Sequence, residues 1–318
     1  MQFIKPKFWD FKKPNLIAYL LLPLCLLIKI NNFLIKKKFK HKSSKIKTIC
    51  VGNIYIGGTG KTPTVLKIYE LINSIKLKIC TAKKIHPNHK DEMILLNKNS
   101  KLISATNREK IIHNAINKKY DLIIFDDGLQ DKRVDYDIKF VCFDSQLWIG
   151  NGFLIPAGPL RETIESLIKY DAVFIKHTSR QIDFRKKNLI IKRINPKIKI
   201  FNSFSKIKNI NNFNLNNRYL IFSGIGNNKN FRNTLLEYKF IIEKEITFPD
   251  HFRYNNNDII EILSIAEKKG LKIITTEKDY VKIPKKFKNK ISFVKLSLEI
   301  IEEKELIKFI KSKINENN

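Results

Sequence analysis

Short apolar runs alternate with amphipathic stretches along most of the chain from residue 47 onward. The apolar runs predict strands at Thr48–Val51, Ile79–Cys80, Leu122–Phe125, Ile138–Phe143, Ala172–Ile175, Tyr219–Phe222 and Lys272–Thr275. The stretches between them predict helices at Pro63–Ser74, Ile94–Leu96, Arg108–Lys118, Phe231–Tyr238, Asn257–Lys269 and Glu302–Ile314. Because strands that alternate with helices favour parallel pairing, we expect an α/β fold with a mostly parallel sheet covered on both faces.

The pattern weakens at Phe204–Asn217, which is rich in Asn and Lys and predicts a linker between two lobes. At 318 residues the chain is long enough for two domains. We therefore expect an N-terminal helical segment at 1–38, a larger lobe at 39–204 and a smaller α/β lobe at 205–318.

The N-terminal segment has a different pattern, because Leu16–Ile28 contains thirteen residues without a charge. A helix needs about 20 apolar residues to span a bilayer, so this run is short. No small-residue cleavage site follows Ile28, which argues against a signal peptide. Lysines flank the run on both sides, among them Lys12, Lys13 and Lys29. We expect a membrane-associated helix that lies in the interface with its lysines at anionic headgroups. The alternative is a buried helix of a soluble core.

Composition narrows the classes of protein. With 43% hydrophobic residues the chain can bury cores, which excludes a wholly disordered protein. The net charge of +31 suggests a nucleic-acid partner, but only nine of the 61 basic residues are arginines. Because arginine is the better ligand for phosphates and bases, we interpret the surplus as a lysine-rich surface and expect no nucleic acid. The four cysteines lack paired metal-ligand spacing, which fits a reducing compartment.

The strongest chemical signal is the segment Gly52–Thr62, in which a β-rich run enters a glycine loop followed by Lys and Thr. Glycines allow backbone N–H groups to surround phosphate oxygens, and the start of the next helix adds partial positive charge. Tyr55 departs from the usual pattern, which has glycine at that position. The predicted nucleotide-binding residues are Gly57, Gly58, Thr59, Gly60, Lys61 and Thr62. We therefore expect the larger lobe to be P-loop NTPase-like.

An acidic pair, Asp126 and Asp127, ends the apolar run that begins at Leu122. An apolar strand that ends in carboxylates is how proteins with a phosphate loop reach Mg²⁺. The predicted metal ligands are Thr62, Asp126 and Asp127, with ATP and Mg²⁺ as cofactors. The alternative for the Asp-Asp-Gly sequence is a solvated turn.

Further segments resemble those of the tetraacyldisaccharide 4′-kinase family, the lipid A 4′-kinases of Gram-negative bacteria. The matching segments are Val51–Pro63, Asp91–Leu96, Asp126–Gln130, Gly150–Glu162, Ser223–Asn227, Phe248–Tyr254 and Thr275–Asp279. They follow the family's order and cover most of the chain, and the N-terminal apolar run lies where the family has its membrane anchor.

The resemblance implies transfer of the ATP γ-phosphoryl group to the 4′-hydroxyl of tetraacyldisaccharide 1-phosphate, which gives lipid IVA in lipid A biosynthesis. It implies two α/β/α lobes with the active site in the cleft between them. The implied partners are the lipid A disaccharide 1-phosphate and anionic inner-membrane lipids. The implied location is peripheral, at the cytoplasmic face of the bacterial inner membrane.

The resemblance also implies roles for single residues. Asp91 is the implied general base, which His251 pairs with and tunes, while Lys61 holds phosphates and Asp127 serves the metal or positions the nucleophile. The implied substrate-binding residues are Asn151, Arg161 and Glu162. From the residues alone, a turn role for His251 and a simple helix start at Arg161 and Glu162 stay open.

The chain departs from the family pattern between Thr81 and Met93, where an Arg-Gly-Tyr element is missing and Lys90 replaces a glycine. Two other classes of function are open. A soluble P-loop ATPase or GTPase, acting as a switch or metal-delivery factor, has a similar glycine loop. It has no use for the apolar N-terminus or the Gly150–Glu162 motif, and no Asn-Lys-x-Asp element is evident here. A nucleic-acid-binding protein predicts Arg-rich or aromatic-interleaved patches, and we find none.

Overall fold

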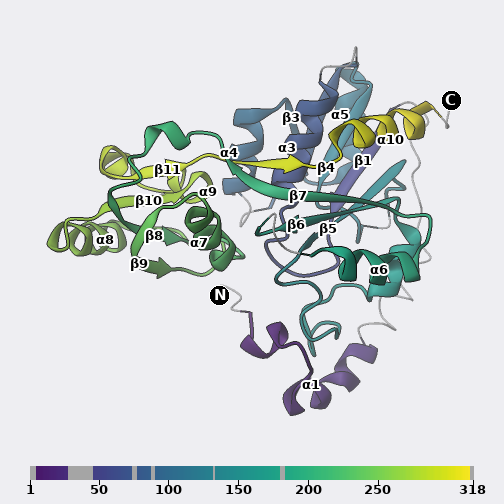
Figure 1. Ribbon diagram of the computed structural model, residues 1–318. Coiled ribbons are helices and arrows are strands. Elements are labelled where there is room, and N and C mark those ends of the chain that lie inside the picture. The colour runs from purple at the N-terminus through teal and green to yellow at the C-terminus, as the bar shows by residue number, and fades with distance from the viewer. Residues whose placement is uncertain are drawn as a thin grey trace.

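Two α/β lobes make up the fold of the computed structural model, which describes residues 5–27, 46–73, 77–86, 90–131, 133–179 and 183–315 (Figure 1). The strands of the larger lobe are β1 (Lys47–Gly52), β2 (Ile79–Lys84), β3 (Leu102–Ala105), β4 (Leu122–Asp126), β5 (Ile138–Asp144), β6 (Ala172–His177), β7 (Lys199–Ile207) and β12 (Leu296–Ile300). They form one sheet in the order β12-β7-β6-β5-β1-β4-β2-β3. Every pairing in this sheet is parallel except that of β12 with β7. The expectation of a mostly parallel sheet is confirmed.

Helices cover both faces of this sheet. One face carries α3 (Lys61–Ile72), α4 (Lys90–Asn99) and α10 (Glu303–Asn315). The other face carries α5 (Arg108–Asn117), the 3₁₀ helix η4 (Ile164–Lys169) and α6 (Arg185–Ile194). Successive side chains of a strand point to opposite faces, so Ile49 and Val51 of β1 enter the first core and Cys50 enters the second. Burial on both faces explains why the strands read as continuous apolar runs.

The smaller lobe is a second parallel sheet in the order β11-β10-β8-β9. Its strands are β8 (Arg218–Ser223), β9 (Ile241–Thr247), β10 (Lys272–Thr276) and β11 (Ser292–Val294). Its helices are α7 (Asn228–Glu237), α8 (Asn256–Lys268) and the one-turn α9 (Glu277–Tyr280), and 3₁₀ turns occur at η5 (Ile210–Asn212) and η6 (Lys285–Lys290). A capping box between Asn255 and Asp258 fixes the start of α8, because each side chain accepts from the other's backbone N–H.

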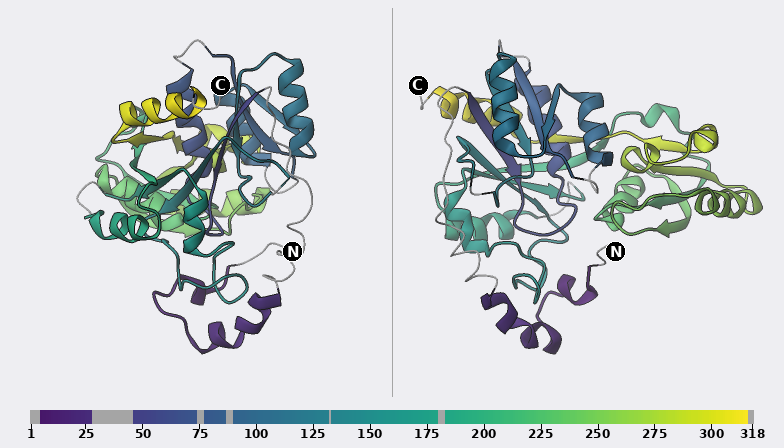
Figure 2. Two further views of the ribbon diagram at one scale, coloured as in Figure 1. Left: turned by 90° about the vertical axis from the view of Figure 1, so that its right-hand side faces the viewer. Right: turned by 180° about the vertical axis from the view of Figure 1, so that it is seen from behind.

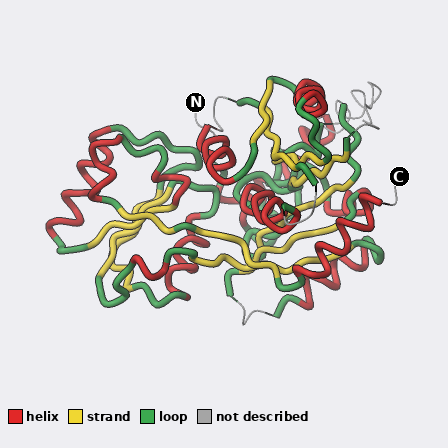
Figure 3. The backbone as a smooth tube through the Cα atoms, turned by 90° about the horizontal axis from the view of Figure 1, so that it is seen from above, coloured by secondary structure: helices red, strands yellow, loops and turns green. Residues whose placement is uncertain are grey.

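The division between the lobes differs from the expected boundaries. The predicted linker Phe204–Asn217 is wrong at its start, because Phe204–Ile207 continues β7, so a boundary at 204/205 lies inside a strand. After the smaller lobe the chain returns, and β12 pairs with β7 while α10 packs on α3. Residues 296–315 therefore belong to the larger lobe, although the sequence prediction places them in 205–318. The smaller lobe is thus connected to the larger lobe by two crossings of the chain (Figure 3).

The described part of the N-terminal segment docks on the larger lobe as three short helical pieces: the 3₁₀ helix η1 (Lys7–Asp10), α1 (Leu16–Leu20) and residues 22–27 (Figure 2). The prediction of a single helix over Leu16–Ile28 is therefore wrong, because a turn at residue 21 divides it. Ile28 itself lies outside the described residues. Pro23 explains the break, since it has no backbone N–H to donate to the preceding turn. Among the described residues, no helix is long and apolar enough to cross a membrane.

Few side chains of the N-terminal segment are buried. Trp9 is 2% exposed, and its Nε1 donates to the carbonyl of Pro156 at 3.0 Å. Cys25 Sγ donates to the carbonyl of Leu154 at 3.2 Å, and Ala18 is fully buried. Most of the apolar residues face outward instead, and their exposed fractions are 75% at Leu16, 51% at Ile17, 71% at Leu20, 59% at Leu26 and 62% at Leu27. This exposure does not fit the alternative of a buried core helix.

The return of the chain to the larger lobe makes a prediction for stability. Leu306 of α10 is fully buried in the core with Ile68 of α3, whereas Ile301 in the same segment is 53% exposed. We expect Leu306→Ala to lower the free energy of unfolding by about 2–5 kcal/mol, because a buried leucine loses packing and leaves a cavity. Ile301→Ala is the control and should change it by at most about 0.5 kcal/mol. Urea unfolding measures both, and a loss below about 1 kcal/mol for Leu306→Ala would contradict the docking of α10.

Candidate active site between the lobes

A cavity of about 1280 Å³ lies between the two lobes, at the carboxyl end of β1. The phosphate loop and the first turns of α3 line it from the larger lobe, and loops that follow β8, β9 and β10 line it from the smaller lobe. Parallel α/β sheets bind ligands outside the carboxyl ends of their strands, where the strand order reverses. Because β4 and β5 pair with opposite edges of β1, the cavity occupies this place in the sheet.

The phosphate loop begins where β1 ends. Gly60 has a φ of +87° immediately before α3, a conformation that glycine adopts without strain. The side chain of Asn53 holds the loop from inside, donating to the carbonyl of Gly57 at 3.2 Å and to Thr59 Oγ1 at 3.0 Å. Tyr55, the departure from the usual pattern, is fully buried and donates its hydroxyl proton to Asp10 at 2.5 Å. The tyrosine therefore connects the loop to the N-terminal segment.

Asp127 forms ion pairs with the positive side chains next to the phosphate loop. Lys61 Nζ lies 3.6 Å from its Oδ2, and Arg161 Nη1 lies 3.2 Å from both carboxylate oxygens. Burial opposes ionisation of Asp127, but Lys61 and Arg161 outweigh it and lower its pKa to about 2. The residue has a φ of +61°, and Arg108 Nη2 donates to its carbonyl oxygen. A non-glycine residue held in this conformation is typical of a functional site.

Asp126 meets Thr62 at the predicted metal position. The Thr62 hydroxyl donates to Asp126 Oδ2 at 2.8 Å, and Lys83 Nζ lies 2.7 Å from the same oxygen. Among the described atoms, the buried Asp126 Oδ1 has no hydrogen-bond partner. No three His, Cys, Asp or Glu side chains of the described ranges cluster as a metal site. Mg²⁺ usually retains several waters and phosphate oxygens, so the Thr62 hydroxyl and the free Asp126 oxygen fit it as protein ligands.

Arg161 and Glu162 lie before the 3₁₀ helix η4, which starts at Ile164, so they are not the first residues of a helix. Glu162 Oε1 accepts from Gln130 Nε2 at 2.9 Å and from the Tyr170 hydroxyl at 2.9 Å. Gln130 also accepts from Arg161 Nη1 at 3.3 Å. These contacts place the Arg-Glu pair beside the acidic pair, with Arg161 lining the cavity.

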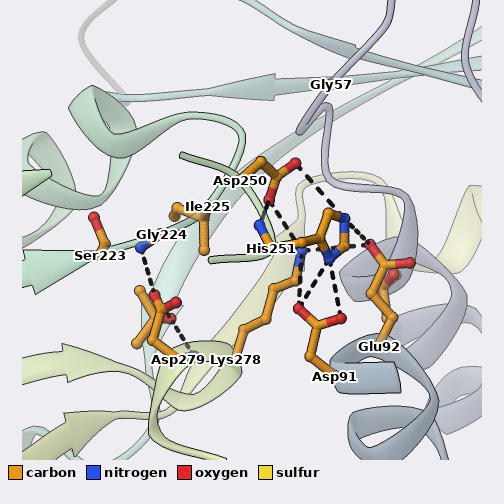
Figure 4. Close-up of polar contacts among 12 residues, drawn as sticks. Gly57, Asp91, Glu92, Ser223, Gly224, Ile225, Asp250, His251, Lys278 and Asp279 are labelled. Atoms are coloured by element: carbon orange, nitrogen blue, oxygen red, sulfur yellow. Dashed lines mark hydrogen bonds and ion pairs between the residues drawn. The ribbon is translucent and has the colours of Figure 1, made fainter. Parts of the chain in front are cut away.

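Asp91 and His251 come together from the two lobes, as the resemblance implies (Figure 4). His251 Nδ1 lies 3.0 and 3.1 Å from the two oxygens of Asp91, which is on the first turn of α4. Because an ionised carboxylate only accepts hydrogen bonds, Nδ1 of His251 carries the proton. Its Nε2 lies 3.9 Å from Glu92 Oε1 and 3.8 Å from Asp250 Oδ2. Burial opposes ionisation of Asp91, but the His251 hydrogen bond and the charge of Lys278 outweigh it and lower its pKa to about 2.

Lys278 lies among three carboxylates at the same junction (Figure 4). Its Nζ is 3.5 Å from Asp91 Oδ2, 3.5 Å from Glu92 Oε1 and 3.3 Å from Asp250 Oδ1. Burial alone would lower the pKa of Lys278, but these carboxylates raise it above its ordinary value. Glu92 also pairs with Lys83 at 2.6 Å, so a continuous chain of charges connects Asp126 to the smaller lobe.

The loop Ser223–Asn227 brings the smaller lobe against the phosphate loop. A Cβ on Gly226 would lie 2.4 Å from the backbone nitrogen of Gly58, so only glycine permits this approach. Asp144 at the end of β5 accepts from Asn227 Nδ2 at 3.1 Å and from Asn230 Nδ2 at 2.9 Å. The contact between the lobes is therefore specific at the phosphate loop itself.

Two residues predicted to bind substrate, Asn151 and Glu162, are not among the residues that line the cavity. Asn151 is buried, donates to the carbonyl of Ala157 at 2.9 Å and accepts from the backbone N–H of Phe153 at 3.1 Å. It stabilises the loop that carries the N-terminal segment, and it is not among the residues that line the central cavity.

Sequence reasoning missed several residues of this site. Gln130 and Lys278 belong to segments that match the family, Asp126–Gln130 and Thr275–Asp279. The motifs therefore indicated that these two residues matter, but the sequence analysis assigned them no role. Lys83 had no such signal, because one lysine among so many does not stand out. Glu92 adjoins Asp91, but its pairing with Lys83 depends on a contact between β2 and α4.

Comparisons with known proteins agree with this arrangement. A family model described as tetraacyldisaccharide-1-P 4′-kinase matches residues 17–315. Proteins named tetraacyldisaccharide 4′-kinase are 45% identical in Pelagibacter ubique, over 100% of both chains, and 34% identical in Rickettsia akari, over 89% of each. The crystal structure of Aquifex aeolicus LpxK in complex with ATP is similar in fold, with a TM-score of 0.67 at 20% identity over 94% of this chain and all of that one. The chain belongs to the tetraacyldisaccharide-1-P 4′-kinase family.

Proposed function

We propose that the protein transfers the γ-phosphoryl group of ATP to the 4′-hydroxyl of tetraacyldisaccharide 1-phosphate, giving lipid IVA in lipid A biosynthesis. The observation that carries this proposal is that the phosphate loop and His251 line one cavity, and that His251 pairs there with Asp91. Family membership supplies the acceptor, because the relatives carry the name of this reaction. A switch ATPase or GTPase would leave this pair, which joins the two lobes, without a role.

The phosphate loop would hold the nucleotide. Backbone N–H groups of the glycine loop and the start of α3 favour anions, and Lys61 adds a full positive charge. In this structure Lys61 and Arg161 both face Asp127, so phosphate oxygens would share these cations with the carboxylate. The transition state of phosphoryl transfer is stabilised mainly by positioning and by cations, which is what this cluster provides.

Thr62 and Asp126 would hold Mg²⁺, as the hydroxyl and the unpartnered buried oxygen suggest. When bound there, the ion neutralises charge on the β- and γ-phosphate oxygens. Lys83 would hold the Asp126 carboxylate in place, because its Nζ lies 2.7 Å from Oδ2.

Asp91 would receive the 4′-hydroxyl of the acceptor. With a pKa of about 2 it is ionised at neutral pH, so it accepts a hydrogen bond but is a weak base. That suits a reaction in which the attacking hydroxyl loses its proton late. His251 orients the carboxylate through Nδ1, and Lys278 holds the pair in the half-buried junction.

The N-terminal segment would place the cavity at a membrane. Its exposed leucines form an apolar face next to the loop that carries Arg161, and contiguous exposed apolar surface marks membrane or protein contacts. We infer that the protein is peripheral at the cytoplasmic face of the inner membrane, on anionic lipids. The acyl chains of the acceptor could then stay in the bilayer while its sugar reaches the cavity.

The nucleotide assignment predicts the effect of removing one cation. Lys61→Ala should lower phosphorylation of the lipid by on the order of 10²–10³-fold, since the transferring group loses a preorganised charge. Transfer of ³²P from ATP to defined tetraacyldisaccharide 1-phosphate, with Mg²⁺ and detergent, measures this. Lys101→Ala, at an exposed lysine between α4 and β3, is the control. Near wild-type turnover by folded Lys61→Ala protein would refute the assignment.

The Asp91–His251 pair predicts non-additive losses. Asp91→Asn should lower kcat by on the order of 10²-fold or more, and His251→Gln should lower it less, because the histidine acts through the carboxylate. The double variant should be about as slow as Asp91→Asn alone, since residues that act as a unit are non-additive. Steady-state rates at saturating ATP complete the cycle. Losses that multiply in the double variant would show that the two residues act independently.

The apolar face predicts membrane binding by particular side chains. Leu16→Ser/Leu20→Ser should reduce flotation with phosphatidylglycerol-containing vesicles by about tenfold or more, because each buried leucine contributes about 1.5–3 kcal/mol. Both positions are more than two-thirds exposed, so folding should be unaffected. Ile168→Ser/Leu189→Ser is a matched control at exposed positions of the larger lobe, 70% and 58% exposed. Equal flotation of the two variants would place the membrane contact elsewhere.

A further inference from the structure

Lys176 lies beside the phosphate loop, and nothing above assigns it a role. It is near the carboxyl end of β6, where it is in register with Asp144 of β5. Its side chain reaches the cavity, and its Cδ is 3.4 Å from the position that a Cβ on Gly60 would occupy. The residue therefore contacts the loop from the β6 side, whereas Asp127 approaches it from the β4 side.

Four other cations in or beside the cavity have carboxylate partners. Lys61 and Arg161 pair with Asp127, Lys83 pairs with Asp126, and Lys278 pairs with three carboxylates. Within the described part of the chain, the Lys176 ammonium makes no hydrogen bond and has no carboxylate within 4.0 Å. It differs from these four cations in this respect.

Asp144 is close to Lys176, but both of its carboxylate oxygens already accept hydrogen bonds from other groups. Its Oδ1 accepts from two backbone N–H groups of the following turn, at 2.9 and 3.2 Å. Its Oδ2 accepts from the side chains of Asn227 and Asn230 of the smaller lobe. A carboxylate accepts about four hydrogen bonds, so Asp144 provides a nearby negative field without capturing the ammonium. The Lys176 ammonium remains available to a ligand.

A lysine in this setting is unfavourable without an anion. Burial lowers the pKa of Lys176 below its ordinary value, although the nearby Asp144 opposes the shift. Charged groups taken out of water require a compensating partner. The cavity in front of Lys176 is the one that the glycine loop prepares for phosphates, so the missing partner is an anion of the ligand.

We propose that Lys176 binds a non-bridging oxygen of the α- or β-phosphate of the nucleotide. The γ-phosphate belongs on the other flank, because Asp127, Arg161 and the Asp91–His251 pair lie there. Lys176 therefore contributes to binding of the ground state more than to the transfer step. The proposal rests on the proposed function only in that a nucleotide occupies the phosphate loop, and it does not depend on the acceptor.

Calorimetric binding of ATP, ADP and adenosine to the full chain tests this without any lipid. Lys176→Met keeps the length of the side chain and removes its charge. We expect it to weaken ATP and ADP about equally, by roughly tenfold, and to leave adenosine unchanged. Lys176→Arg should recover part of the loss. Lys199→Met, at the exposed opposite end of the neighbouring strand β7, should bind as the wild type does.

Stability and kinetics separate ligand binding from a structural role. Without nucleotide, Lys176→Met should melt at the same temperature as the wild type or higher, because an unpaired cation has been removed. In lipid phosphorylation its KM for ATP should rise about tenfold while kcat changes less than threefold.

Two results would overturn the proposal: ADP affinity within twofold of the wild type, or a melting temperature lowered by several degrees without nucleotide. Lys61→Met is the reference for the loop itself. If it also leaves ADP binding unchanged, the nucleotide site and the proposed function fail together. If Lys61→Met weakens ADP and Lys176→Met does not, only the role of Lys176 is wrong.

Discussion

The two lobes meet through opposite charges that are largely withdrawn from water, and the rest of the site depends on this constraint. Asp91 and Glu92 approach from the larger lobe, while His251 and Lys278 approach from the smaller lobe. A buried ion is costly unless it is paired, so each lobe carries charges that are satisfied only when the other is in place. The same requirement extends through Lys83 to Asp126 and the phosphate loop. Interlobe contact and assembly of the catalytic groups are therefore one event.

The N-terminal segment also supports the site. Tyr55 of the phosphate loop bonds to Asp10, and Trp9 packs on the loop that leads to Arg161. The N-terminal segment thus contacts both the phosphate loop and the loop that leads to Arg161. Under the proposed function, a membrane that held this segment would fix the height and direction of the cavity above the bilayer, which would suit an acceptor with a polar sugar and apolar acyl chains.

Local signals in the sequence predicted most of the fold and much of the site. Both-face burial produces apolar runs, so most of the central strands of both sheets were found, and glycine chemistry located Lys61 and Thr62. Strands β3, β9 and β11 were missed because they are short or half exposed, as the alternation at Ile241–Thr247 illustrates. Strand β7 was missed although it lies inside the sheet, because its last residues belong to a stretch rich in Asn and Lys that predicts a linker. The return of β12 and α10 was missed because apolar periodicity does not say which sheet a strand joins. Lys83, Lys176 and Asp144 gain their meaning only from neighbours distant in the sequence.

The double crossing between the lobes has a consequence for biosynthesis. The smaller lobe is an insertion between β7 and β12, so all of its strands are adjacent in the chain and it can fold as a unit. The larger lobe is incomplete until Leu306 and Ile310 of α10 cover the apolar face of α3. During synthesis at the ribosome, the lobe that begins first is therefore finished last, after α10 has left the exit tunnel. Until then the uncovered apolar face of α3 and the large sheet is open to aggregation.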